Sequence, residues 1–454
     1  MSHKLLLCSA VFLILSCKPH SNSDNKVKLI TLDPGHFHAA LVQKSMYADV
    51  DPNVFVYAPG GTDLQEHLAR INNYNSQSES PTLWNEQVYE GSDFFEKMIR
   101  EKKGNVVVLA GNNQKKTDYI NRSIQAGLNV LADKPMAINR TGFELLLKAF
   151  DAAGEKGLLL YDIMTERSEI TTLLQREFSM DTLIFGHLEK GTPDDPAVTK
   201  ESVHHFFKYV SGAPLKRPAW FFDVEQQGDG MVDVTTHLVD LIQWECFPEQ
   251  VIDYRHDIII DSSRRWPTVL TPLQFREVTS EVAYPEYLNK YVKDSLLNVF
   301  SNGVINYRIN GVHARISVAW NYMAPEGTGD THFSIMKGTF CDLIIRQGKE
   351  QNYKPVLYIE AKVPYTKIYD ALYAKLHLLQ NTYPGLHFNL NDKGWEVVIP
   401  DKYRIGHEEH FAQVMERFLE YLKQGNIPEW EIPNMKAKYY TTTRALEMAT
   451  SSAK

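Results

Sequence analysis

The sequence predicts an α/β protein of two domains: an amino-terminal doubly wound parallel sheet, then an α+β domain with a mainly antiparallel open sheet. The 454 residues, 43% of them hydrophobic and 23% charged, are enough for two globular domains. Short apolar strands alternate with helices up to about residue 160, which indicates a parallel sheet. Beyond that point the strands are longer, rich in aromatic residues and separated by turns, which favours antiparallel pairing.

The first domain is expected over residues 26–160. Its strands are the short apolar runs 27–32, 54–58, 105–110, 128–132 and 158–161. Helical periodicity marks the segments between them at 94–101, at 116–126, and in a helix capped by Thr141 that ends near Lys156. Each strand is therefore followed by a helix that covers one face of the sheet.

The second domain is expected over residues 161–433. Its predicted strands are 204–210, 299–305, 313–322 and 331–337, and its predicted helices are 233–244 and 407–422. The carboxyl-terminal segment 434–454 contains a last predicted helix, 434–449, which we expect to pack back on the first domain.

The amino terminus has the features of an export signal. His3 and Lys4 precede an apolar run over 5–15, about half the roughly 20 residues that a bilayer span requires. The run ends in Ile14-Leu15-Ser16-Cys17, which resembles a bacterial lipobox, so residues 1–17 form a predicted lipoprotein signal peptide and Cys17 the lipidation site. The alternatives are a secretory signal cleaved elsewhere and an apolar start that is no signal at all. Residues 18–25 are a predicted flexible tether. We expect an exported protein, anchored by lipid alone to a bacterial membrane as a periplasmic or outer-membrane lipoprotein.

Charge and cysteine content exclude other classes. The net charge of −8 is spread along the chain without a basic stripe, so nucleic acid is not an expected partner. After the signal only Cys246 and Cys341 remain, without a Cys-x-x-Cys partner or a histidine at zinc-ligand spacing. The sequence analysis therefore predicts no metal site and no disulfide framework.

A strand, a helix and a second strand ending in Asp133-Lys134-Pro135 form the most informative segment. It resembles the Gfo/Idh/MocA oxidoreductase family, in which a strand ends in Glu-Lys-Pro, with Asp133 here replacing the glutamate. The resemblance implies a Rossmann domain and places Lys134 at the carboxyl end of a strand, near a nicotinamide and a substrate hydroxyl. Open α/β sheets bind ligands at that edge.

A second motif runs from Gly228 to Leu241 and is similar to the family's glycine-rich turn followed by Asp-x-x-x-His. Asp233 and His237 match that pair, while Thr235 stands where family members usually have glycine. The spacing of four predicts both side chains on one helix face. Taken alone, such a pair is also typical of a surface or capping contact. Joined to the lysine motif, it is interpreted as catalytic.

The resemblance implies catalytic roles for these three residues. His237 is the expected base for a hydroxyl proton, Lys134 is expected to stabilise the developing charge on oxygen, and Asp233 is expected to orient the imidazole. The predicted activity is NAD(P)-dependent oxidation of a hydroxyl on a sugar, glycoside or polyol, with tightly held cofactor. Two alternatives stay open: redox-neutral glycoside cleavage by oxidation and elimination, and a non-catalytic sugar-binding lipoprotein.

The nucleotide-binding turn departs from the family. The segment Asp33-Pro-Gly-His-Phe-His38 replaces the Gly-x-Gly-x-x-Gly fingerprint, and only Gly35 matches. His36 and His38 are either phosphate donors or active-site groups, or partly buried residues of a capped turn. Asp63 is a candidate ribose partner. The cofactor, NAD or NADP, is expected to contact Gly35, His36, His38, Asn112, Asn113, Asp133 and Lys134.

Candidate substrate residues lie in the second domain. The run 204–209 alternates, so that His204 and Lys208 share one strand face. Together with Arg217, Trp220 and His237, Lys208 is interpreted as carbohydrate-binding, although such residues are also typical of core and rim. Segment 320–332 resembles the family's sheet hairpin, which is commonly a subunit interface. The expected partners are therefore a small carbohydrate and other copies of the chain.

Overall fold

The computed structural model describes residues 26–210 and 213–451. The predicted signal peptide over 1–17, its lipidation site Cys17 and the predicted tether over 18–25 lie outside the described residues. Among the residues described, none of the helices has the length and apolar character that a bilayer crossing requires.

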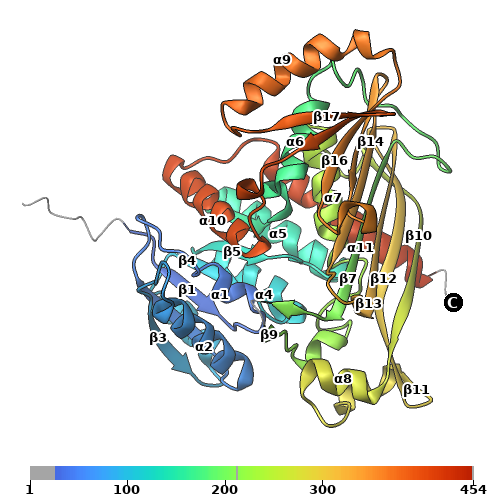
Figure 1. The fold of residues 1–454 in the computed structure, drawn as a ribbon. Coiled ribbons are helices and arrows are strands. Elements are labelled where there is room, and N and C mark those ends of the chain that lie inside the picture. Colours follow the sequence, from blue (N-terminus) through green and yellow to red (C-terminus); the bar gives the residue numbers. More distant parts are fainter. Residues whose placement is uncertain (1–25, 211–212, 452–454) are drawn as a thin grey trace, which may run out of the picture.

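The first sheet contains six parallel strands in the order β3-β2-β1-β4-β5-β6 (Figure 1), which confirms the predicted doubly wound sheet. The strands are β1 (Leu29–Leu32), β2 (Asn53–Ala58), β3 (Asn85–Glu90), β4 (Val106–Leu109), β5 (Asn129–Asp133) and β6 (Leu160–Ile163). The central strands are continuously buried because helices cover both faces of the sheet. The order reverses between β1 and β4, and a doubly wound sheet binds its ligands at that point.

Five helices connect these strands. They are α1 (His38–Leu41), α2 (Thr62–Ser76), α3 (Phe94–Glu101), α4 (Asn113–Gln125) and α5 (Arg140–Lys156). Helix α5 begins two residues earlier than predicted because Asn139, not Thr141, is its cap: the Asn139 side-chain oxygen accepts a hydrogen bond from the amide of Gly142 at 2.8 Å. Helix α1 is a single turn, so the usual helix after the first strand is almost absent.

The second sheet is mixed and mostly antiparallel, as predicted, and its long strands stand together at the right of Figure 1. Its strand order is β10-β12-β13-β7-β14-β15-β16-β18-β17, with β11 paired to β12. The strands are β7 (Val198–Phe207), β10 (Ile258–Leu270), β11 (Val292–Lys293), β12 (Leu296–Ile309), β13 (Val312–Met323), β14 (Thr331–Lys337), β15 (Cys341–Arg346), β16 (Val356–Ala361), β17 (His387–Asn391) and β18 (Gly394–Val398). A separate short pair is formed by β8 (Tyr209–Val210) and β9 (Ala213–Pro214).

The predicted hairpin over 320–332 is wrong. Strand β7 lies between β13 and β14 and pairs with both, in parallel with the first and antiparallel to the second. The segment that joins β13 to β14 therefore crosses the end of β7 instead of closing a tight turn. This crossing carries Asp330 to the same end of the sheet as His204.

The helices of the second part lie against this sheet and against the first domain (Figure 1). They are α6 (Ile170–Ser179), α7 (Thr235–Cys246), α8 (Pro272–Thr279), α9 (Tyr369–Gln380), α10 (His407–Gln424) and α11 (Glu431–Ser451). Helices α10 and α11 belong partly to the core of the first domain, because Phe411, Phe418, Met435 and Tyr439 pack among its buried side chains.

A buried network of charges joins the two domains through α11. Lys438 on α11 bonds Asp162 at the end of β6 at 2.7 Å and Asp240 on α7 at 2.8 Å. Arg167 bonds the same Asp240 at 2.6 Å and Glu431 at 3.0 Å. All five side chains are at most 3% exposed. The network fixes α7, which carries His237, relative to β6 and the rest of the first sheet.

Candidate active site

A cavity of about 390 Å³ lies where the carboxyl ends of the parallel strands face the second sheet. Lys134 and Asp133 reach it from the end of β5, Asp233 from the turn before α7, and His237 from α7 itself. The structure thus brings together the three residues predicted to be catalytic, although they come from both domains.

Lys134 and Asp233 form an ion pair on the wall of this cavity. The Lys134 ammonium donates to Asp233 Oδ1 at 2.6 Å, and both side chains are about one-tenth exposed. Burial favours the neutral amine, but the Asp233 and Asp133 carboxylates outweigh it and hold the pKa of Lys134 above its ordinary value. Lys134 is therefore a permanent cation at neutral pH, suited to stabilising negative charge on an oxygen atom.

The glycine-rich turn explains where Asp233 lies. An added Cβ at Gly230 would stand 1.9 Å from the main-chain oxygen of Ser301, so only glycine allows the turn to pack against β12. The turn continues past Asp233, and α7 begins only at Thr235, which corrects the predicted helix start at 233. Asp233 consequently does not share a helix face with His237.

The expected role of Asp233 also changes. One carboxylate oxygen accepts the Lys134 bond and the other accepts a bond from Gln227 Nε2 at 3.3 Å. Burial raises the pKa of Asp233, but the Lys134 ammonium outweighs this and holds that pKa below its ordinary value. The prediction that Asp233 orients the imidazole is therefore wrong; this carboxylate positions the lysine instead.

His237 is a buried, neutral imidazole. Burial, followed by the nearby Lys134 ammonium, lowers the pKa of His237 to about 4. Its Nδ1 atom has no hydrogen-bond partner among the described residues. A neutral imidazole beside a permanent cation accepts a proton without first having to lose one, as a general base at neutral pH requires.

The residues predicted to bind cofactor divide between two cavities. Asn113 lines the first cavity together with His36, His38, Asp133 and Lys134. Gly35 and Asn112 line a second cavity of about 440 Å³ over the ends of β1, β2 and β4, together with Asp63. Arg217 belongs to the walls of both cavities.

Trp220 lies in the second cavity and not beside Lys134 and His237, which corrects its prediction as a substrate residue. Its indole nitrogen donates to Asp63 Oδ2 at 3.0 Å, and its ring packs over Gly35. Lys208 does line the first cavity. Arg217 is buried, and its guanidinium donates to the main-chain oxygens of His205 and Phe206, so it holds strand β7 as well as lining the site.

One carboxylate, that of Asp330, accepts hydrogen bonds from three basic side chains on β7 and the segment that follows it. Asp330 accepts bonds from His204 at 3.2 Å, from His205 at 3.0 Å and from Lys208 at 2.8 Å. Burial opposes its ionisation, but the two histidine bonds outweigh burial and hold the pKa of Asp330 far below its ordinary value. His204 and His205 are adjacent on β7, and they meet at Asp330 because the carboxylate offers one oxygen to each.

Sequence reasoning missed several other residues of the cavity: Glu166, Glu169, Gln227, Asp330, His332 and His407. Glu166 lies in a single 3-10 turn, and its bond from His407 at 3.3 Å joins positions far apart in the chain. No local pattern marks such a contact. His407 alone carried a signal, since it begins the predicted helix that is now α10.

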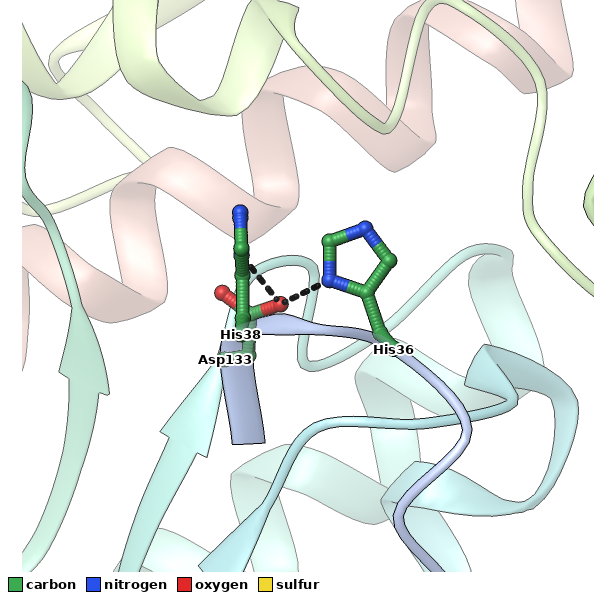
Figure 2. Close-up of side chains that lie close together, drawn as sticks. All are labelled: His36, His38 and Asp133. Carbon is green, nitrogen blue, oxygen red and sulfur yellow. Dashed lines mark hydrogen bonds and ion pairs between the residues drawn. The ribbon is translucent and has the colours of Figure 1, made fainter. Parts of the chain in front are cut away.

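The turn after β1 directs both of its histidines toward the end of β5 (Figure 2). His38 Nδ1 lies 3.0 Å from Asp133 Oδ2, and His36 Nδ1 lies 3.6 Å from the same oxygen. The backbone of this turn is engaged as well, since the amides of Gly35 and His36 both donate to the main-chain oxygen of Ala110.

This arrangement, a parallel six-stranded domain whose strand ends face a large mixed sheet, is a fold that the chain shares with solved oxidoreductases. Residues 174–450, more than half of the chain, match the family described as "Putative oxidoreductase C terminal domain". The chain belongs to this family.

The solved structures agree with this placement. A "putative oxidoreductase" from Parabacteroides merdae ATCC 43184 is 57% identical, with 94% of this chain and 98% of that chain covered and a TM-score of 0.92. Levoglucosan dehydrogenase in complex with NADH and levoglucosan is 11% identical, with coverage of 94% and 98% and a TM-score of 0.59. Biliverdin reductase from Synechocystis sp. PCC 6803, in complex with biliverdin and NADP+, is 10% identical, with coverage of 93% and 99% and a TM-score of 0.56. The last two share the fold alone. No curated protein matches the chain.

Proposed function

We propose that the chain is an NAD(P)-dependent oxidoreductase that acts on a hydroxyl group of a sugar, glycoside or polyol. The main support is that one cavity, at the carboxyl ends of the parallel strands, is lined both by the cation Lys134 and by the neutral imidazole of His237. Levoglucosan dehydrogenase, which shares the fold, binds NADH and a sugar. Hydroxyl oxidation needs both a base for the proton and a positive group beside the oxygen.

The nicotinamide end of a dinucleotide fits the first cavity. Asn113 Nδ2 donates to the main-chain oxygen of Gln227 at 2.6 Å, but Asn113 Oδ1 is buried without a partner among the described residues. A buried acceptor of this kind calls for a donor, and a carboxamide or a ribose hydroxyl supplies one. When bound, the nicotinamide would supply a site for the hydride that leaves the substrate carbon.

The other end of a dinucleotide would be held in an unusual way. The amides of Gly35 and His36 are engaged with Ala110, and α1 is too short to offer a helix amino terminus to phosphate. The second cavity instead offers the Lys115 and Lys216 side chains, with Asp63 in the first turn of α2. Lysines fit a pyrophosphate as point charges, so the residues fit the group through side chains in place of loop amides.

The chain's own residues divide the proton chemistry between them. His237 would accept the proton of the hydroxyl group, and the Lys134 ammonium would hydrogen-bond the same oxygen as its negative charge grows. Asp233 holds the lysine by its 2.6 Å bond, and Gln227 holds Asp233. The aromatic rings of Phe221 and Trp320 and the polar groups of Lys208 and Asp330 line the space left for a carbohydrate.

The deciding experiment is a search for bound dinucleotide. Purified protein is denatured, and the supernatant is assayed for NAD(H) and NADP(H); a direct titration of the folded protein with both dinucleotides follows. We expect about one dinucleotide per chain to be released or bound. If the protein neither releases nor binds a dinucleotide, a nicotinamide-dependent reaction is excluded. Carbohydrate binding is then the function to test.

The pH dependence of turnover follows from His237. Its pKa is lowered to about 4, and the neutral form is the one that accepts a proton. Activity is therefore expected to stay level as the pH falls from 7 to about 5 and to be lost as the pH approaches 4. A profile of kcat/KM against pH, with enzyme stability checked at each value, measures this limb. An acid limb near pH 6.5 would show that the base is not this imidazole.

A further inference from the structure

His36, His38 and Asp133 form a compact cluster on the wall of the active-site cavity. Figure 2 shows both imidazoles directed at one carboxylate, with His36 from the turn after β1, His38 from the first position of α1 and Asp133 from the end of β5. One donor atom from each residue lies within 4.8 Å of the other two. The proposed proton chemistry uses none of these three side chains.

The spacing of the donor atoms suits a first-row metal ion. Two ligands that each lie about 2.1 Å from an ion are about 3.0 Å apart at a right angle and about 3.4 Å apart at the tetrahedral angle. Nδ1 of His38 and Nδ1 of His36 lie 3.0 Å and 3.6 Å from Asp133 Oδ2. Both histidine–carboxylate separations therefore match the spacing of two ligands on one ion.

A simple histidine–carboxylate hydrogen bond explains the position of one of the two histidines but not of the other. It explains His38, which shares a hydrogen bond with Asp133. It leaves His36 unexplained, because His36 Nδ1 is buried, faces the same oxygen and has no hydrogen-bond partner among the described residues. A buried polar atom aimed at two other ligand groups is the second sign of a missing partner.

A neighbouring lysine holds Asp133 in place. The Lys116 ammonium donates a hydrogen bond to the main-chain oxygen of Asp133 at 2.9 Å and so fixes the backbone of that residue. The neighbouring Lys134 charge is already balanced by Asp233.

We propose that His36, His38 and Asp133 bind one divalent first-row transition-metal ion whose remaining coordination positions open into the cavity of Lys134 and His237. Two imidazoles and one carboxylate with open positions form a ligand set known for zinc and iron. The site also accounts for the departure from the glycine fingerprint, since the two histidines stand where that turn would otherwise approach a pyrophosphate. Vicinal oxygens of a carbohydrate are the ligands that suit the open positions.

No metal site was predicted from the sequence, because the chain has neither a Cys-x-x-Cys pair nor a histidine at zinc-finger spacing from a cysteine. The available signal was His36-x-His38, which follows a buried strand after a short turn. The third ligand came from a strand almost a hundred residues later, so the set is complete only in the fold.

The test is metal binding by the untagged full-length protein after removal of metal with a chelator. Zn²⁺ is titrated calorimetrically, and Co²⁺ is followed by its visible absorption bands. We expect one ion per chain and absorption bands typical of nitrogen and oxygen ligands. His36→Ala and Asp133→Asn are expected to lower the affinity at least about tenfold. His256→Ala is the matched control, because His256 forms an exposed pair with Asp253 at 2.8 Å, and no third ligand joins that pair among the described residues.

The melting temperatures of the metal-free variants show whether they fold. No ion bound by the wild-type chain, or equal affinity in the wild type and in a folded ligand variant, would overturn the proposal. The titration contains neither dinucleotide nor carbohydrate, so its failure is distinguishable from failure of the proposed function.

Discussion

Replacing His237 by alanine is expected to lower kcat/KM by a factor of roughly 10² to 10⁴, the usual contribution of a general base. The melting temperature should change little, because His237 lines an open cavity and its Nδ1 bonds no described residue. Steady-state kinetics with a carbohydrate substrate and a thermal melt measure the two quantities.

His377→Ala is the matched control for this variant, since His377 is an exposed residue of α9 that does not line the cavity and whose ring contacts Gln380. It should retain wild-type turnover. Near-normal turnover in the His237 variant would remove the imidazole from the proposed mechanism. The Lys134→Met variant is a poorer first choice, because it leaves the Asp233 carboxylate buried without its cation.

Replacing Arg167 by methionine is expected to destabilise the protein by about 3–5 kcal/mol, the cost of removing one partner from a buried ion pair. Arg167 is 3% exposed and bonds both Asp240 and Glu431, so the substitution leaves two buried carboxylates short of a cation. Chemical denaturation of the variant and the wild type, followed by fluorescence, measures the change.

Arg444→Met provides the comparison, because Arg444 bonds Glu447 on the surface of the same α11 helix and is 42% exposed. Its loss should cost less than about 1 kcal/mol. If the two arginine variants unfolded alike, the buried network would not be what joins the domains.

Much of the fold follows from local sequence, and its exceptions have physical reasons. Strand β4 could be predicted from the sequence because it is buried on both faces and is therefore a continuous apolar run of four residues. Strand β3 was missed because it forms the sheet edge and most of its residues are polar and exposed. The long β10 was missed as well, because its exposed charged residues break the apolar alternation.

The site was only partly predictable, for a different reason. Lys134 and His237 were found because each belongs to a motif that is continuous in the chain. No such motif contains Glu166, Asp330 or His407. These residues come close to Lys134 and His237 only in the folded protein, where the two domains meet. Asp233 was found, but its role was misjudged, since a turn and not a helix carries it and turns it toward Lys134.

The order in which the chain is made bears on when this protein becomes active. Tyr439, near the carboxyl end, completes the apolar core of the first domain, and Lys438 neutralises Asp162 at the end of a strand nearly three hundred residues earlier. While only the first half of the chain has been synthesised, the hydrophobic core of the first domain is therefore incomplete. Assembly of the catalytic cleft must wait until the final helix has been synthesised, so premature termination before that helix would yield an inactive product even with every cleft residue present.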